Sequence, residues 1–581
     1  MSVTGEAINT NLLKRVFAYI NPYKKVFYSA LILTILLAII APVRPYLIQY
    51  TIDHSITDGN VSGLINMILI MTVLLIFQGI LQFYHTYTTN WLGQSAINDL
   101  RQQVFNHLMD MRVRFFDRTP IGTLVTRTVS DIEVIADIFS EGLIVIVGDI
   151  LQIVTIIGVM LYVDWRLTLI SLSVMPLLMI ATYVFKEKTK KAFQEVRTEV
   201  SRINTFLQEH ITGMKIVQVF AREKQEMENF KKINRLHRDA HIRSVLYYSV
   251  FFPVVEIIAA ASIGLMVYYG AIGVISDRFS VGVLVSFILY INMLYRPLRE
   301  LADKFNTLQM GMVSSERIFK VLDTDDSTPN TGTIKEVEIK GKIEFRNVWF
   351  AYTDEDWVLK GISFTIMPGQ TLALVGATGS GKTTIINLLN RFYDKTKGEI
   401  LIDDILVEEY ELGYLRSAIA TIMQDVFLFS DSVAENMRLR NQLINDQELE
   451  NSATEVGALS FIDKLPGRLN FEVMERGSSI SAGQAQLLSF TRALVYNPKI
   501  LILDEATSSV DSEAEMMIQQ ATDTLMKGRT AVIVAHRLST IQHADKIIVM
   551  QKGEIMEEGN HQALLKKEGI YKSLYEIQFS K

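Results

Sequence analysis

The chain has 581 residues, a formal net charge of −6 and 49% hydrophobic residues. It is too long for one ordinary core, and its mean hydropathy of +0.23 indicates that a large part lies in lipid. The charge gives no support for a nucleic-acid partner, and the absence of cysteine excludes disulfides, thiolate metal sites and a cysteine nucleophile. The polar start of the chain does not resemble a cleavable signal.

Six apolar stretches of about 20 residues or more fill the first half, and each is long enough to cross a bilayer. They lie at 26–48, 62–88, 139–163, 166–186, 247–273 and 280–303. The loops after the first, third and fifth stretches are short and contain almost no Lys or Arg, whereas the segments after the second and fourth are long and basic. Because basic loops stay in the cytoplasm, we expect a multi-pass protein of the plasma or inner membrane with both termini cytoplasmic.

The two basic segments keep a helical period, so we expect the membrane helices to continue into the cytoplasm and turn there. Ahead of the first stretch, apolar residues between 12 and 20 share one helical face. That pattern fits either a helix lying in the membrane interface or an extension of the first span.

The composition changes after residue 322. We expect a transmembrane domain over 1–322, a linker over 323–341 and an α/β domain over 342–581. The last domain is predicted from short apolar runs interleaved with helical stretches. These runs are Ile343 to Phe350, Thr371 to Val375, Ile500 to Leu503, Ala531 to Val534 and Lys546 to Met550.

A glycine-rich loop stands between an apolar strand and an apolar helix in this domain. Its residues include Gly376, Thr378, Gly379, Ser380, Gly381, Lys382, Thr383 and Thr384. Glycines let backbone N–H groups close around phosphates, and the following helix adds the positive end of its dipole. The loop predicts a nucleoside triphosphate ligand, with Lys382 reaching the β/γ-phosphates and the Thr383 hydroxyl on Mg²⁺.

Two carboxylates, Asp504 and Glu505, follow the apolar run that ends at Leu503. The carboxyl edge of an α/β sheet is where ligands bind. We expect Asp504 to hold Mg²⁺, directly or through water, and Glu505 to act as the general base on the attacking water.

A serine- and glycine-rich segment lies ahead of the apolar run that ends at Leu503. Together with this segment, the motifs resemble the nucleotide-binding domain of ATP-binding-cassette (ABC) transporters. The resemblance implies a signature at Ser481, Ala482, Gly483 and Gln484 that binds the partner's ATP. It also implies an adenine-stacking Tyr352, a glutamine loop at Gln424 that serves catalysis and Mg²⁺, a D-loop Asp511 and a catalytic switch histidine, His536.

Six spans followed by one cassette is the half-transporter layout of the exporter class of this family. The resemblance implies an all-α six-helix membrane domain, an α/β ATPase domain, and a dimer that holds each ATP between the phosphate loop of one chain and the signature of the other. Ala482 stands where the family usually has glycine. This difference is either tolerated variation or a mark of pairing with a related half-transporter whose own signature or carboxylate is altered.

Two inner turns resemble the coupling helices that exporters dock onto their cassettes. The first contains Phe116, Asp117 and Pro120, and the second contains Glu209 and Gly213. The alternative is that both are ordinary cytosolic turns. Within the membrane, Glu256 is the candidate for substrate or ion contact, with an interhelical hydrogen bond as the alternative.

The sequence thus predicts an ATP-driven exporter or flippase that uses ATP and Mg²⁺, works as a dimer with a second copy favoured, and moves an amphipathic lipid or drug-like compound. An ATP-gated channel or a regulatory subunit is the alternative, although such proteins often lack the carboxylate that Glu505 supplies. An importer would generally place spans and cassette on separate chains, and a soluble cassette ATPase is inconsistent with six spans.

Overall fold

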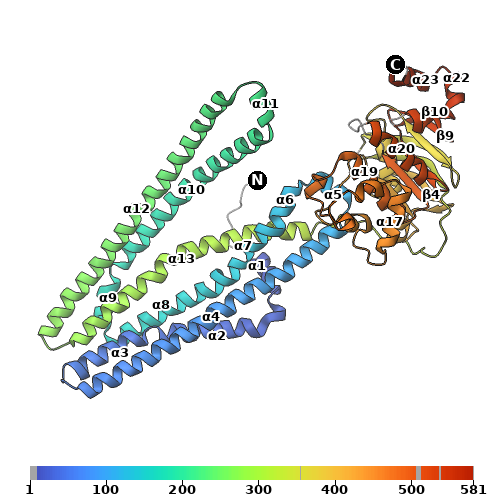
Figure 1. Cartoon of the computed structure of the whole chain (residues 1–581). Helices are drawn as coiled ribbons and strands as arrows, with labels where there is room; N and C mark the ends of the chain where they lie inside the picture. Colours follow the sequence, from blue (N-terminus) through green and yellow to red (C-terminus); the bar gives the residue numbers. More distant parts are fainter. Residues whose placement is uncertain (1–9, 354, 505–511, 536–537, 580–581) are drawn as a thin grey trace. The chain divides into compact units, whose positions relative to one another are not determined.

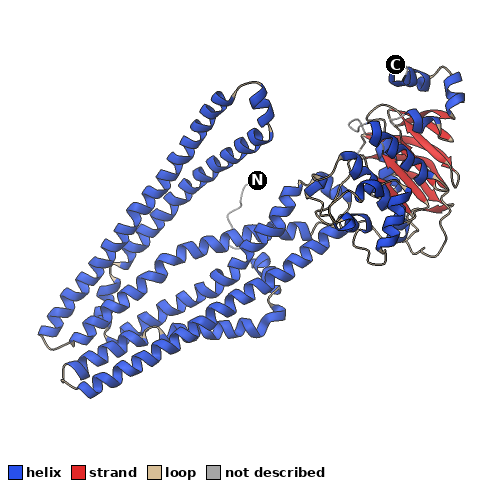
Figure 2. Cartoon of the chain, in the orientation of Figure 1, coloured by secondary structure: helices blue, strands red, loops and turns tan. Residues whose placement is uncertain are grey.

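The computed structural model describes residues 10–353, 355–504, 512–535 and 538–579. It divides into two compact units. The first comprises Met1–Met109 and Pro120–Asp325, and the second comprises Asp110–Thr119 and Asp326–Lys581. Among the described residues, the first unit is helical, and the strands of both sheets lie in the second (Figure 2).

Long helices, some continued by π-helical turns, make up the first unit (Figure 1). They are α1 (Thr10–Ala18), α2 (Lys24–Ile40), α3 (Val43–Thr51), α4 (Val61–Asp110), α6 (Ile121–Thr126), α7 (Ile132–Asp137), α8 (Leu143–Val163), α9 (Trp165–Leu172), α10 (Met175–Thr212), α11 (Met214–Val219), α12 (Glu223–Ile275) and α13 (Val281–Leu322). The helices α10 and α12 lie side by side as an antiparallel pair joined through α11 (Figure 1).

All six apolar stretches predicted from the sequence fall on these helices. Five helical segments of the described chain are long and apolar enough to cross a membrane, and a sixth apolar stretch, Val281–Pro297, is shorter. The 53 residues of α12 extend about 80 Å at the helical rise, whereas the hydrocarbon core is about 30 Å thick. The helix α12 is therefore longer than is needed to cross the hydrocarbon core, as the predicted extension of the membrane helices requires.

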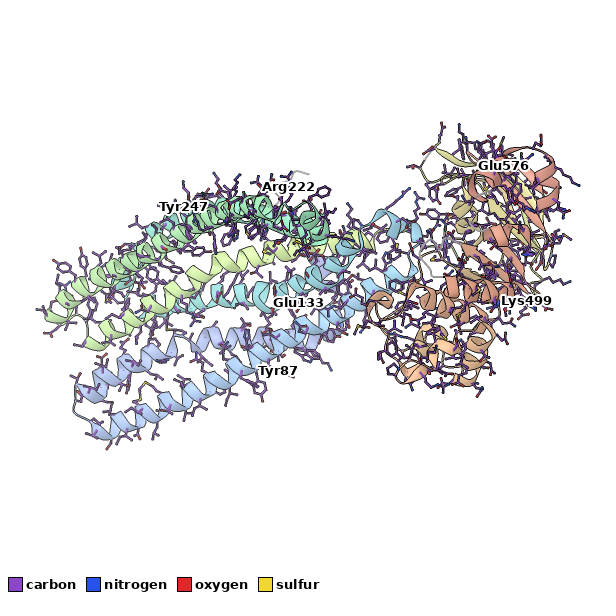
Figure 3. The ribbon with its side chains drawn as sticks, turned by 45° about the horizontal axis from the view of Figure 1, so that its top comes forward. Tyr87, Glu133, Arg222, Tyr247, Lys499 and Glu576 are labelled. Atoms are coloured by element: carbon purple, nitrogen blue, oxygen red, sulfur yellow. The ribbon has the colours of Figure 1, made fainter. Side chains whose placement is uncertain are left out.

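Much of the apolar side-chain surface of the first unit is not covered by protein. Tyr87 on α4 is 59% exposed, and its side chain projects away from the helices in Figure 3. The most apolar 18-residue window of α4 contains no buried residue. Such a surface is unstable in water and suits the bilayer interior.

The helix before the first span is separate from that span, because a 3₁₀ turn, Asn21–Tyr23, lies between α1 and α2. Val16 and Ile20 are buried against α4, α7 and α13, in contact with Ile97, Ile135 and Phe319. Arg15 also forms an ion pair with Asp323 at 2.7 Å. The interpretation of α1 as an extension of the first span is wrong, and its apolar face packs mainly on protein.

The second unit contains two sheets. A four-stranded antiparallel sheet has the order β2-β1-β4-β5, and a six-stranded sheet has the order β10-β9-β3-β8-β7-β6. The strands are β1 (Ile343–Ala351), β2 (Trp357–Ile366), β3 (Thr371–Val375), β4 (Lys397–Ile402), β5 (Ile405–Leu406), β6 (Ile419–Ile422), β7 (Ile500–Asp504), β8 (Thr530–Val534), β9 (Lys546–Gln551) and β10 (Glu554–Gly559).

Helices complete this α/β unit. They are α5 (Val113–Arg118), α14 (Lys382–Leu389), α15 (Leu412–Ser417), α16 (Val433–Arg438), α17 (Asp446–Glu455), α18 (Leu459–Ile462), α19 (Ala482–Val495), α20 (Ser512–Met526), α21 (Leu538–Gln542), α22 (His561–Lys566) and α23 (Ile570–Phe579). The predicted fold class, a helical membrane region followed by an α/β domain, is confirmed.

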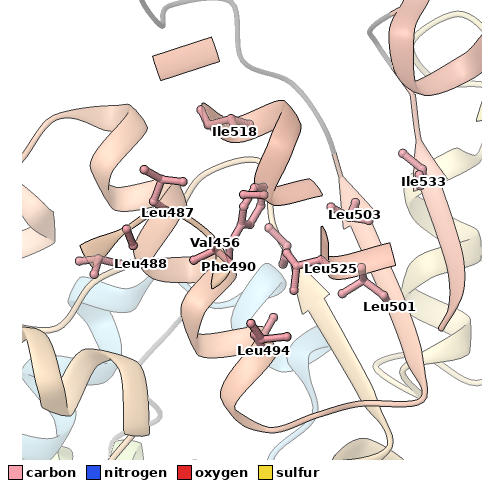
Figure 4. Packing of buried hydrophobic residues seen from close by; sticks show 14 of the residues in the cluster. Val456, Leu487, Leu488, Phe490, Leu494, Leu501, Leu503, Ile518, Leu525 and Ile533 are labelled. Carbon is pink, nitrogen blue, oxygen red and sulfur yellow. The ribbon is translucent and has the colours of Figure 1, made fainter. Parts of the chain in front are cut away.

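The core around the six-stranded sheet fixes its central strands. Leu501 and Leu503 of β7 and Ile533 of β8 are at most 4% exposed and pack against Leu487 and Phe490 of α19 (Figure 4). A second buried cluster, with Leu372 and Leu374 of β3, joins the two sheets. Burial on both faces is why these parallel strands read as continuous apolar runs.

Candidate nucleotide-binding site

The predicted ATP-site segments meet at one edge of the six-stranded sheet. Strands β3, β8, β7 and β6 are mutually parallel neighbours. Their carboxyl ends lie at one edge, so the phosphate loop after β3 shares that edge with Asp504 at the end of β7. Gln424 follows β6, whose Ile422 pairs with Leu503 of β7.

Two glycines of the phosphate loop have conformations that a side chain would disturb. Gly376 has φ of +156°, and a Cβ there would lie 2.3 Å from the Met550 carbonyl oxygen. Gly381 has φ of +104° and immediately precedes α14. Since L-residues rarely adopt such φ values, glycine at these two positions lets the loop turn tightly between β3 and α14.

Lys382 is the first residue of α14 and is 7% exposed. Its Nζ donates hydrogen bonds to the carbonyl oxygens of Gly376, at 2.7 Å, and Ala377, at 3.1 Å. Burial lowers the pKa of Lys382, while the negative charge of Asp504 acts in the opposite direction. The ammonium therefore lies within the loop, where it can meet the negative charge of a phosphate.

The neighbouring hydroxyls differ in their surroundings. Ser380 is 3% exposed, and its buried Oγ has no hydrogen-bond partner among the described residues. A buried polar atom without a partner is costly, and a phosphate oxygen would supply one. Thr383 is exposed at the start of α14, which suits a hydroxyl that binds a metal ion, whereas Thr384 is buried. Thr378 and Gly379 lie in the loop itself. These features fit Mg-ATP.

The predicted catalytic residues Glu505 and His536 and the predicted D-loop residue Asp511 lie outside the described residues. The structure gives the strands that precede two of them, because β7 ends at Asp504 and β8 ends at Val534. Asp504 pairs with Val534 across the two strands.

The predicted signature forms the start of α19. Ser481 is the N-cap, and its Oγ accepts a hydrogen bond from the Gln484 N–H at 3.3 Å. The Gln484 side chain in turn accepts from the Ser481 N–H at 3.0 Å, which completes a capping box. Ser481 and Ala482 are exposed, and Gly483 is buried.

Ala482 is the first helical residue of α19 and is absent from the described non-glycine residues with positive φ. Its Cβ is therefore compatible with the backbone. Ala482 adds no backbone strain, because the signature begins an ordinary right-handed helix.

Tyr352 follows β1 and is half-buried. Its ring meets the rings of Phe350 and Tyr393 edge-on, with centroids 4.8 and 4.9 Å away. Its hydroxyl lies 3.2 Å from the Thr384 Oγ1 and accepts a hydrogen bond from Asn387 at 3.3 Å. Both partners belong to α14, so the candidate adenine contact is tied to the helix that begins at the phosphate loop.

The first inner turn groups with the cassette rather than with the long helices. Asp117 of α5 accepts a hydrogen bond from the Tyr393 hydroxyl, and Arg118 donates to the Tyr352 carbonyl at 2.8 Å. Phe116 is 38% exposed, and Pro120 is the N-cap of α6. Asp117 was among the coupling residues predicted from the sequence, whereas no motif identified its partner Tyr393.

In the second inner turn, Glu209 lies in the last turn of α10, and Gly213 is the C-cap. The Gly213 N–H donates to the Glu209 carbonyl at 2.8 Å. The short helix α11 then exposes apolar side chains, with Ile216 65% and Phe220 69% exposed, Phe220 being its C-cap.

The substrate candidate Glu256 is exposed on α12 beside the buried Val255. A different charged pair lies between α8 and α13, where Lys304 and Asp149 form an ion pair at 2.5 Å with side chains only 17% and 14% exposed. Lys304 was not identified from the sequence as a charged residue among the membrane helices, because it follows the last apolar stretch. The sequence signal for the pair was the charged Asp149 inside the third apolar stretch.

Comparison with known families identifies both halves of the chain. Residues 27–298 match the family model described as the ABC transporter transmembrane region, and residues 359–508 match the family model described as ABC transporter. The chain belongs to the ABC transporter family, and carries both parts in one polypeptide.

Relatives in this family align over nearly the whole chain. An uncharacterised ABC transporter ATP-binding protein of Bacillus subtilis is 39% identical over 97% of this chain and 94% of its own length. An ATP-dependent lipid A-core flippase of Haemophilus influenzae is 36% identical over 98% of this chain and 97% of its own. A probable multidrug resistance ABC transporter ATP-binding/permease protein of B. subtilis is 36% identical over 89% and 77%. The predictions of an exporter-type half-transporter, an ATP hydrolase coupled to transport and a multi-pass membrane protein are confirmed.

Proposed function

We propose that two copies of this chain form an exporter or flippase that moves an amphipathic lipid or drug-like compound out of the cytoplasm or inner leaflet. The cassette structure carries this proposal, because Ser380 and Lys382 of the phosphate loop are buried while the signature serine is exposed at the start of α19. In this arrangement the exposed signature of one copy closes on the nucleotide held by the other. Closing and separation of the cassettes then drive alternating access of the membrane helices.

The site residues have distinct proposed roles. Bound Mg²⁺ would neutralise phosphate charge, held by Thr383, Gln424 and Asp504. Lys382 and the loop amides orient the phosphates, and Tyr352 stacks on adenine. Glu505 takes the proton from the attacking water, and His536 orients the γ-phosphate end of the site. Asp511 is assigned to the D-loop.

The domain and topology assignments complete the proposal. Residues 1–322 form the membrane domain and 342–581 the cassette, joined through 323–341. Both termini are cytoplasmic, in the plasma or inner membrane, because the basic segments follow the second and fourth spans. The inner turns at Phe116 and Gly213 transmit motion between cassette and membrane helices.

Three observations support an amphipathic substrate. The relatives include proteins named for lipid A-core flipping and for multidrug resistance. The membrane helices expose apolar and aromatic side chains, and charged groups occur among them at Asp149, Lys304 and Glu256. A compound with an apolar body and a polar end would contact both kinds of surface.

The test is ATP hydrolysis by the full-length protein in lipid nanodiscs, screened against phospholipids, anionic glycolipids and hydrophobic cations. We expect a dimer whose activity is inhibited by vanadate and stimulated severalfold by one of these classes. A chain that stays inactive until a different half-transporter is added would refute the homodimer. Stimulation by none of the classes would refute the substrate proposal.

Glu505→Gln tests the hydrolytic role. Removing a general base costs about 10²- to 10⁴-fold in rate, so turnover should fall to background while ATP binding is kept. Hydrolysis and nucleotide affinity are measured on the same preparation, and Glu515→Gln, a change in the following helix α20, is the control. Normal turnover in Glu505→Gln would remove Glu505 from the general-base role.

A further inference from the structure

The segment from Asp110 to Thr119 is fixed to the cassette by contacts at both ends. At its start, Arg112 forms an ion pair with Asp394 at 2.7 Å, and its Nε donates to the Ser327 carbonyl at 2.6 Å. The Arg112 side chain is only 18% exposed, so this pair is partly shielded from water. Such contacts hold α5 in one position on its own cassette.

At the other end of α5, side chains form hydrogen bonds with Tyr352, the candidate adenine contact, and with its neighbour Tyr393. Arg118 binds the backbone carbonyl of Tyr352, and Asp117 binds the hydroxyl of Tyr393. Asp117 and Arg118 are adjacent, so two consecutive side chains of α5 contact two aromatic residues that contact each other.

Tyr393 connects these contacts. Its ring lies edge-on to Tyr352, at 4.9 Å and 88°, and edge-on to Phe350, at 5.7 Å and 75°. Burial, followed by the hydrogen bond to Asp117, raises the pKa of Tyr393, so its hydroxyl stays protonated and donates at neutral pH. Packed rings and a charged acceptor leave Tyr393 little freedom to move independently of Tyr352 or α5.

We infer that Tyr393 is a positioning residue through which α5 responds to the nucleotide base at Tyr352, in addition to any response to the phosphates. The inference deepens the proposed function and rests on it, because that proposal assigns adenine stacking to Tyr352. Base stacking on an aromatic ring is strong enough to favour one position of Tyr352 over another. The Tyr352 carbonyl and the Tyr393 ring transmit that position to Arg118 and Asp117.

The consequence is a specific dependence on the base. Nucleotides that fill the phosphate loop equally should move α5 by different amounts, according to how well their base stacks on Tyr352. The chain crosses directly from α4 into this segment, so the response reaches a membrane-spanning helix through the covalent backbone.

The test uses the absence of cysteine in the chain. Asp58→Cys places one spin label per copy on the exposed turn after α3, and Glu505→Gln prevents hydrolysis. Label-to-label distances are measured in nanodiscs with ATP and with UTP, each at the concentration that gives equal bound nucleotide. Tyr393→Phe removes the hydroxyl and keeps the ring. Tyr496→Phe is the matched control, because it removes a tyrosine hydroxyl that bonds the Arg438 carbonyl elsewhere in the cassette.

We expect the label distance to change more with ATP than with UTP in the parent protein and in Tyr496→Phe. In Tyr393→Phe the two nucleotides should give the same response, and about tenfold more ATP should be needed for half of the parental change, the effect of losing one hydrogen bond to a charged group. With Glu505 restored, hydrolysis by Tyr393→Phe at saturating ATP should stay within about twofold of the parent, because the phosphate contacts are unchanged.

Asp117→Asn, which keeps an acceptor for Tyr393, should retain the ATP preference, whereas Asp117→Leu should lose it. A Tyr393→Phe protein that keeps the parental difference between ATP and UTP would overturn the inference. Parallel loss of hydrolysis and nucleotide binding in Tyr393→Phe would also overturn it, since that result marks a merely structural residue. If the label distance in the parent protein changes with neither ATP nor UTP, the proposed function itself would be refuted.

Discussion

Two helices of the cassette begin in opposite ways. The helix α14 follows Gly381, which has no side chain to cap the helix, so its first N–H groups are left for an external anion. The helix α19 follows Ser481, which caps the Gln484 N–H, while Gln484 caps the Ser481 N–H in return. One helix start needs a phosphate as its cap, and the other supplies its own.

This difference fits the proposal that two surfaces bind one triphosphate with different affinities. The uncapped start of α14 is enclosed by a loop with the buried Lys382 and Ser380, so it can hold nucleotide within a single chain. The self-capped start of α19 is exposed, and its Ser481 hydroxyl hydrogen is not used in the cap. That hydrogen is free to be donated to a phosphate, and the proposed function assigns this surface to the phosphate that another chain presents.

Among the changes that test this comparison of α14 with α19, the largest effect is expected from Lys382→Ala, which removes the cation from the nucleotide-holding side. Losing one preorganised phosphate contact costs about 10²- to 10³-fold in hydrolysis, and ATP affinity should fall as well. The assay combines nucleotide binding with steady-state turnover, and Lys499→Ala, a change at an exposed lysine (Figure 3), is the control. Unchanged ATP affinity in Lys382→Ala would contradict the comparison.

His536→Ala should lower hydrolysis by about 10²-fold and leave Mg-ATP affinity unchanged. The reason is that His536 is proposed to act on the reacting end of the nucleotide; in the sequence it follows β8, which ends at Val534. His543→Ala, at an exposed histidine beyond α21, is the matched control. If His536→Ala lowers the Mg-ATP affinity but keeps the hydrolysis rate at saturating ATP, His536 contributes to nucleotide binding rather than to hydrolysis.

Ser481→Ala should leave ATP binding to the separate chain intact and lower hydrolysis by about tenfold, since one hydrogen bond from the partner side is lost. The same change removes an N-cap, so the free energy of unfolding should fall by about 1 kcal/mol. Ser481→Thr keeps both the hydroxyl and the cap and should restore most of each quantity. If Ser481→Ala weakens ATP binding to isolated chains, the assignment of α19 to the partner's nucleotide fails.

The smallest effect is expected from Ala482→Gly. Because Ala482 is already helical, glycine relieves no strain and costs up to about 1 kcal/mol in helix stability. Hydrolysis should therefore change by less than about twofold. A large gain in activity would indicate that Ala482 disables this signature and that the chain depends on a partner with a different one.

Much of this arrangement was predictable because its signals are local. The phosphate loop combines glycines, a lysine and a hydroxyl in one short segment, and the strands β3, β7, β8 and β9 are continuous apolar runs. The membrane helices were equally clear, since their length and hydropathy reflect the bilayer rather than a tertiary partner.

What could not be predicted depends on contacts between distant residues. Tyr393 has an ordinary sequence context, and its importance comes from meeting Asp117, 276 positions earlier in the chain. The strands β2, β4 and β10 contain exposed and charged residues, so their pairing is set by their neighbours rather than by their own pattern. The Lys304–Asp149 pair likewise needed the packing of α8 against α13.

The connection after α13 contains few residues without a hydrogen-bonded neighbour on either side. Asp323 is held by Arg15, and the Asp326 carbonyl accepts a hydrogen bond from the Arg112 N–H, so only two residues separate these fixed points. Further along, Arg391 binds the Pro329 carbonyl. The backbone also passes between the two units at 109–110 and 119–120. The two units are therefore joined by three covalent connections, at 109–110, 119–120 and 325–326, rather than by a single linker.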